Sequence, residues 1–141
     1  MSEPAGCSGA HGRRRVRRSP AWLGLDVLVV VAFVLAGSRE HDSADGLAGL
    51  FRIGWPFLAG LLLGWVLTQA WRAPVAVFPV GLVVWVSTVG GGMLLRTAVG
   101  EGTAASFILV TAAVLGVLTL GWRLVHLAVS RLRRAGPSGA R

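Results

Sequence analysis

Few side chains in this sequence could carry out chemistry, and Asp26 is the first of them. It is the one acidic residue inside any of four long apolar stretches, and it lies one helical turn after the start of the first stretch. A charge at the centre of a membrane helix costs about 2.5 to 3.5 kcal/mol on insertion scales, so such a residue is usually paired or functional. Three interpretations stay open: an ion pair, solvation at the membrane interface, or transfer of a proton or ion.

Two arginines are candidate partners for Asp26. Arg123 lies near the end of the fourth apolar stretch, which crosses the bilayer in the opposite direction to the first, so the two residues lie at similar depth. A carboxylate and a guanidinium can share two hydrogen bonds where water is scarce. Arg72, in the turn after the second stretch, is the competing partner. We therefore predict a buried ion pair between Asp26 and Arg123, with Arg72 as the alternative partner.

A second polar cluster is predicted on the opposite side of the bundle. Its members come from the polar segments that separate the apolar stretches: Arg39, His41, Arg96 and Glu101. A transporter would place such groups on both sides of a central path. The other three apolar stretches have no charged residue near their midplane, which favours a packing role over transport.

No residue pattern predicts an enzyme. His11, His41 and His126 fall in three separate segments, with no cysteine or carboxylate cluster at ligand spacing, so no metal site is expected. Residues 100–105 formally fit a dinucleotide-binding fingerprint, but that motif needs a strand before it and a helix after it in a soluble unit. Its neighbours here are apolar stretches. The sequence therefore predicts no catalytic residues, no metal and no cofactor.

Composition defines the elements that must position these side chains. Of 141 residues, 54% are hydrophobic and 14% are charged, whereas soluble domains have about 45–50% apolar and about 25% charged residues. Each apolar stretch is long enough to cross a bilayer as a helix. We predict an all-α integral membrane four-helix bundle over 21–125, with spans at 21–37, 55–71, 75–95 and 103–125.

Three local patterns refine the spans. In the polar segment before the second span, Leu47, Leu50, Phe51 and Ile53 are spaced like the apolar side of a short helix on the membrane surface. Pro56 suits the first turn of the second span, and Pro79 either starts or kinks the third. Gly60 and Gly64 form a pattern that allows close approach of two helices, either within the bundle or between two copies.

The charge distribution predicts the orientation. Residues 1–20, rich in Gly, Ser, Pro and Arg, are expected to be a disordered basic tail, and 126–141 a second basic tail. The net charge of +8 could suggest nucleic-acid binding, but the arginines lie beside the spans, where they act as topology signals. Eleven of the fourteen lie on one side. We therefore predict a multi-pass inner (plasma) membrane protein with both termini in the cytoplasm.

A set of apolar and glycine-rich motifs resembles a known family. In chain order they are the stretch from Gly37 to His41, Trp55-Pro56-Phe57 with Gly60 and Gly64-Trp65, the stretch from Gly81 to Trp85 with Thr88, the stretch from Gly92 to Arg96, and Ser106-Phe107 with Gly121-Trp122-Arg123. Over residues 21–123 the chain resembles the bacterial, largely actinobacterial, membrane proteins grouped as domain of unknown function 3054. The resemblance implies a four-helix membrane protein with no established activity and no catalytic residues.

Three functional hypotheses follow. The first is a non-enzymatic structural or accessory component, whose partners are the lipid bilayer and either a second copy or other membrane proteins. The alternative is a small proton- or ion-linked transporter or channel subunit that uses Asp26 and the arginine clusters. A membrane-bound enzyme is a third and more remote hypothesis.

Overall fold

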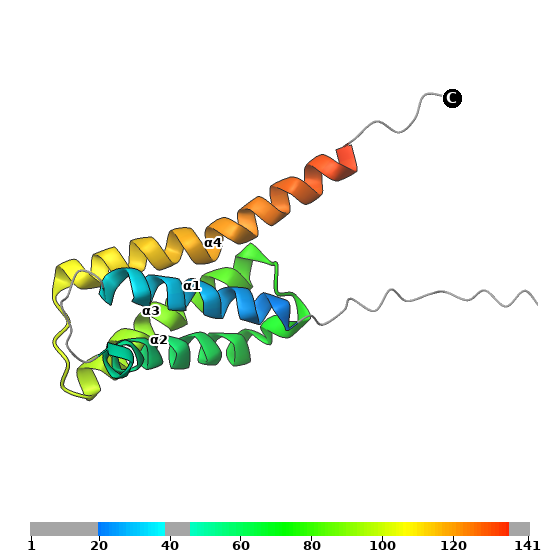
Figure 1. Ribbon diagram of the computed structural model, residues 1–141. Coiled ribbons are helices and arrows are strands. Elements are labelled where there is room, and N and C mark those ends of the chain that lie inside the picture. Colours follow the sequence, from blue (N-terminus) through cyan, green and yellow to red (C-terminus); the bar gives the residue numbers. More distant parts are fainter. Residues whose placement is uncertain (1–19, 39–45, 136–141) are drawn as a thin grey trace, which may run out of the picture.

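The described part of the chain folds into helices joined by short connections. The computed structural model describes residues 20–38 and 46–135, and no strand occurs within them (Figure 1). The predicted all-α four-helix fold is confirmed. The elements are α1 (Ala21–Ser38), α2 (Gly46–Thr68), a 3-10 turn η1 (Ala70–Arg72), a π-type turn η2 (Val77–Gly81), α3 (Leu82–Ala98) and α4 (Ala105–Ala135).

Four segments are long and apolar enough to cross a bilayer. They are Ala21–Ser38, Gly46–Thr68, Val77–Ala98 and Ala105–Arg134. Many of their large apolar side chains are exposed, as expected for helices that face lipid rather than water. α1 and α4 lie side by side, and the largest interface is between α2 and α3 (Figure 1).

The second span begins earlier than predicted. The expected surface helix and the second span form one helix, α2, so Pro56 lies inside it rather than in its first turn. Proline has no N–H to donate to the carbonyl four residues before it, here that of Arg52. Packing against α1 supports this turn: a Cβ atom on Gly54 would lie 3.4 Å from the Val34 side chain.

The third span is interrupted at Pro79. The Phe78–Pro79 peptide bond is cis, and Phe78 has the extended backbone angles φ −121° and ψ 135°. Regular α-helix therefore begins only at Leu82, and it continues to Ala98, past the predicted end at Leu95. The expectation that Pro79 starts or kinks this span agrees with the structure.

The fourth helix is longer than predicted. It extends beyond Val125 to Ala135, so most of the expected C-terminal tail is helical (Figure 1). No glycine or proline interrupts the sequence between Arg123 and Ala135, and Gly136 and Pro137 follow directly. The predicted tail at 1–20 lies outside the described residues except for Pro20, and so do 39–45 and 136–141.

The core lies along the axis of the bundle. Its completely or almost completely buried side chains come from all four helices: Val30 of α1, Phe57 and Leu61 of α2, Val84 of α3 and Leu115 of α4. Trp85 of α3 also donates a hydrogen bond of 3.0 Å to the carbonyl of Ala112 in α4. Apolar packing and one indole donor therefore join helices that are far apart in sequence.

Gly60 and Gly64 allow α2 and α3 to approach closely. A Cβ atom on Gly60 would lie 2.5 Å from the Ser87 carbonyl oxygen, and one on Gly64 would lie 2.9 Å from the Val84 Cα atom. Neither distance leaves room for a methyl group against backbone. The structure thus places both glycines at a contact within the bundle.

We predict that Gly60→Ala destabilises the protein because the added methyl group meets backbone that cannot rotate away. The expected loss is about 1 to 3 kcal/mol, typical of overpacking. Gly90→Ala in α3 is the matched control: its Cβ atom would have no neighbour within 4 Å, so better helix propensity should leave stability equal or slightly higher. Unfolding by sodium dodecyl sulfate in mixed micelles measures both. Equal stability of Gly60→Ala and the parent would contradict the contact.

Candidate functional site

Asp26 and Arg123 meet in the interior of the bundle. The buried face of α1 carries Asp26, Val30, Phe33 and Val34. Asp26 is 1% exposed and Arg123 0%. Arg123 Nη1 donates to Asp26 Oδ1 at 2.9 Å, and Nη2 donates to Oδ2 at 2.6 Å. The two side chains therefore form a bidentate ion pair between α1 and α4.

Two tryptophans complete the surroundings of the carboxylate. Trp65 Nε1, from α2, donates to Asp26 Oδ2 at 2.9 Å, and Trp122 Nε1, from α4, donates to Oδ1 at 3.0 Å. Each carboxylate oxygen thus accepts two hydrogen bonds. An ionised carboxylate has about four lone-pair sites, so the acceptor capacity of Asp26 is used in full.

The guanidinium group is also held on several sides. Arg123 Nη1 donates a second bond to the Thr119 carbonyl at 2.8 Å, and Nε donates to the Pro74 carbonyl at 3.2 Å. Pro74 lies in the connection between α2 and α3. A Cβ atom on Gly81 would lie 3.0 Å from Arg123 Cδ. The turn that contains Pro79 therefore lies against the arginine stem, and a glycine leaves room for it.

Aromatic rings surround the pair. The Arg123 Cζ atom lies 4.3 Å from the centre of the Trp122 ring, a cation–π contact. Trp22 stacks on Trp122 with 5.2 Å between ring centres, and His126 meets Trp22 edge-on. These rings pack between the Asp26–Arg123 pair and the end of the bundle where α1 begins.

Arg72 is not part of this site. It is exposed and donates from Nη1 to Gln69 Oε1 at 2.9 Å, beside the η1 turn. Gln69 has a left-handed backbone, φ 47°, and this turn ends α2 before Arg72 is reached. The expectation that Arg72 competes for Asp26 is therefore wrong.

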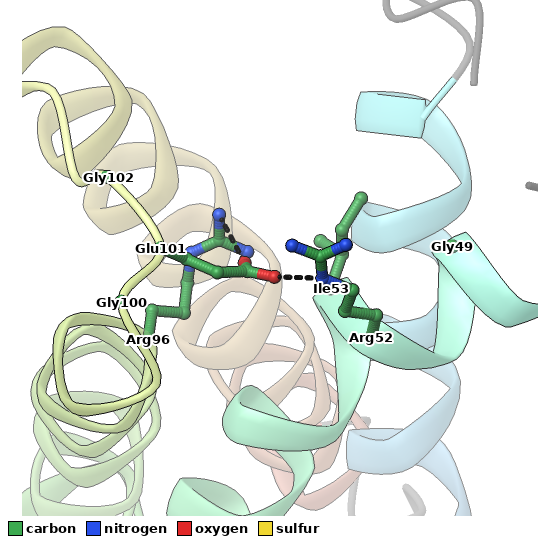
Figure 2. A pocket seen from close by; sticks show the side chains of 7 residues that line it. All are labelled: Gly49, Arg52, Ile53, Arg96, Gly100, Glu101 and Gly102. Carbon is green, nitrogen blue, oxygen red and sulfur yellow. Dashed lines mark hydrogen bonds and ion pairs between the residues drawn. The ribbon is translucent and has the colours of Figure 1, made fainter.

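At the opposite end, Glu101 bridges two arginines. Arg96 Nη2 lies 2.9 Å from Glu101 Oε2, and Arg52 Nε donates to Oε1 at 2.6 Å. Figure 2 shows the carboxylate between the two guanidinium groups, which come from α3 and α2. A cavity of about 410 Å³ borders these side chains. Of the predicted outer cluster, Arg96 and Glu101 come together, and Arg39 and His41 lie outside the described residues.

A known protein family matches the part of the chain that forms both sites. The family model described as "Protein of unknown function (DUF3054)" matches residues 23–126. The chain belongs to this family. The matched region overlaps all four spans and contains both ion-pair sites. Comparisons with curated proteins and with solved structures gave no match.

The sequence analysis missed several residues of the two sites. The Asp26–Arg123 pair also bonds to Trp65, Trp122, Thr119 and Pro74, and Arg52 joins the Arg96–Glu101 pair. The available signal was chemical: a buried indole N–H needs an acceptor, and Asp26 is the one carboxylate within a span. The two carbonyl acceptors had no sequence signal, because every residue has one.

The Asp26–Arg123 site consists of a buried charge pair and the groups that bond to it. Each Asp26 oxygen accepts two hydrogen bonds, and each Arg123 nitrogen donates at least one. Removal of one member of a buried pair leaves an uncompensated charge. Among the described residues, no group of three or more His, Cys, Asp or Glu side chains could hold a metal ion. The contacts recorded at the site are an ion pair, hydrogen bonds and a cation–π contact.

We predict that Asp26→Asn and Arg123→Gln each lower the free energy of unfolding by about 3 to 5 kcal/mol, because each leaves one buried charge without its partner. The double substitution should cost less than the sum of the two, as expected for residues in contact. Trp65→Phe, which removes a single donor, should cost about 1 to 3 kcal/mol.

Arg72→Gln is the control for these variants. It removes an exposed arginine at the same end of the bundle, so its effect should stay within about 0.5 kcal/mol. Detergent titration followed by tryptophan fluorescence and circular dichroism measures all five proteins. Additive losses in the double variant would show that the two charges do not stabilise each other.

Proposed function

We propose that this DUF3054 protein is a non-enzymatic structural or accessory component of the cell membrane. The observation that supports this best is the complete satisfaction of Asp26, whose oxygens accept four hydrogen bonds from Arg123, Trp65 and Trp122. The site joins α1, α2 and α4 and the connection before α3. Its proposed role is to hold a rigid helical surface to which lipids, another copy or other membrane proteins bind.

A proton-carrying role fits this geometry poorly. Protonation would turn an acceptor oxygen of Asp26 into a donor, and one of its present donors would then lose its partner. Arg123 would also remain charged and buried, which costs about 3 to 5 kcal/mol when a pair is broken. The transporter hypothesis therefore becomes one outcome of the test below.

The proposed orientation places both termini in the cytoplasm. Arg72 and the C-terminal part of α4, with Arg131, Arg133 and Arg134, belong to the same end of the bundle as the start of α1. Arg52 and Arg96 belong to the other end. This distribution supports the positive-inside assignment made from the arginine count.

We predict that the purified protein in liposomes conducts neither protons nor common ions above the level of empty liposomes, because its one intramembrane carboxylate is fully paired. A pH-sensitive dye inside the vesicles and ion-selective electrodes measure the flux under an imposed potential. Asp26→Asn should lower abundance and stability without changing flux. A saturable flux that a folded Asp26→Asn protein loses would replace the structural role with transport.

We predict that a reporter fused after residue 141 is active in the cytoplasm and one inserted within residues 40–45 is active outside it, because arginines are retained on the cytoplasmic side. Alkaline phosphatase and green fluorescent protein fusions report the two sides with opposite preferences. Replacing the five arginines at 13–18 should disturb the orientation of α1. High phosphatase activity at the C-terminus would reverse the proposed topology.

A further inference from the structure

A second cavity lies in the seam between α1 and α4, at the end of the bundle opposite the Asp26–Arg123 pair. It has a volume of about 520 Å³, within the range of about 300 to 1,000 Å³ that is typical of small-molecule sites. Its walls are mainly apolar, with Phe33 and Val34 from α1 and Phe107 and Val110 from α4. Apolar walls alone would suit any lipid chain.

Two polar side chains make this cavity chemically specific. Arg96 and Thr111 both line it. Among the described residues, the buried Nε and Nη1 atoms of Arg96 and the buried hydroxyl of Thr111 have no hydrogen-bond partner. Thr111 is 0% exposed, and the Arg96 side chain is 12% exposed. A buried donor without a partner costs about 1 to 3 kcal/mol, more when it is charged, so both groups are suited to a ligand with acceptor oxygens.

The net charge of the side chains around Arg96 favours an anionic ligand. Glu101 binds Arg96 through Nη2 only and is shared with Arg52, so the three side chains carry one net positive charge. The Arg96 guanidinium also lies 5.1 Å from the centre of the Phe107 ring, at the boundary between the polar outer cluster and the apolar walls. An anionic head group at Arg96 would therefore have an apolar compartment directly beside it.

We propose that this cavity binds an anionic single-chain amphiphile, whose carboxylate or phosphate head accepts hydrogen bonds from Arg96 and whose acyl chain packs against α1 and α4. Thr111, one helical turn beyond Phe107, donates its hydroxyl to a further oxygen of the ligand, such as that of a glycerol unit. The inference is independent of the proposed function, because the cavity and the Asp26–Arg123 pair lie at opposite ends of the helices.

The test measures binding to the full-length protein in a neutral maltoside detergent by isothermal titration calorimetry. The probes are oleoyl-lysophosphatidic acid, oleate, monooleoylglycerol and glycerol 3-phosphate. The first two combine an anion with a chain, the third has the chain and glycerol without the charge, and the fourth has the charged head without the chain. We expect saturable one-to-one binding of an anionic amphiphile, at least about tenfold tighter than of either half-probe.

Three variants test the polar end of the site. Arg96→Gln should weaken binding at least about tenfold, as loss of a hydrogen bond to a charged group does. Arg72→Gln, the matched control, removes an exposed arginine at the other end of the bundle, so affinity should change less than about threefold. Thr111→Val should weaken binding of the lysophosphatidic acid about three- to tenfold.

Gly37→Leu fills the cavity and keeps the inference testable if Arg96→Gln fails to fold. Gly37 lines the cavity, and a Cβ atom on it would meet nothing within 4 Å. The variant should fold and lose binding at least about tenfold. Gly24→Leu, on the same helix with equally open space, should bind normally.

Several results would overturn the site. Equal binding of monooleoylglycerol would show an apolar groove without anion recognition, and equal binding of glycerol 3-phosphate would show a free-anion site without a chain. Unchanged affinity in folded Arg96→Gln or Gly37→Leu protein would place the ligand elsewhere. A preference between oleate and the lysophosphatidic acid identifies the head group as carboxylate or phosphate, and either one supports the proposal.

Discussion

Burial of an ion pair away from water requires the protein itself to supply every hydrogen bond that water would have made. Asp26 of α1 and Arg123 of α4 come close to this requirement because two further parts of the chain, α2 and the connection after it, also bond to them. Trp65 approaches from α2, the Pro74 carbonyl from the connection that follows it, and Trp122 from α4 itself. The position of each of these elements is therefore tied to the position of the pair.

The glycines of the bundle make that convergence possible. Gly64 brings α2 so close to α3 that a Cβ atom there would overlap the Val84 backbone, and Trp65 is the next residue in the chain. Gly81 leaves room for the Arg123 stem where the third span turns at Pro79. The close contact between α2 and α3 and the space that Gly81 leaves for the Arg123 side chain allow the donors to reach one carboxylate.

The two ends of the bundle differ in how completely their charges are satisfied. At the end that contains Asp26, the carboxylate and guanidinium bond to each other and to indole and carbonyl groups. At the opposite end, Glu101 is shared between Arg52 and Arg96, and Arg96 retains buried donors beside an apolar cavity. A fully satisfied site stabilises a fold, whereas donors without partners can recognise a ligand. Arg123 thus stabilises a buried carboxylate at one end, whereas Arg96 at the other end keeps donors for the proposed ligand.

The sequence by itself determined the class of fold, the number of spans and the identity of the charges that had to be accommodated. Apolar length and arginine placement are local properties, so they can be read without knowing which helices touch. Only the tertiary structure decided that Asp26 pairs with Arg123 rather than Arg72, that Trp65 and Trp122 complete the site, and that Arg52 joins Glu101. It also decided where α2 begins and α4 ends. These outcomes depend on the depth, rotation and separation of packed helices, which side-chain packing and backbone contacts set together.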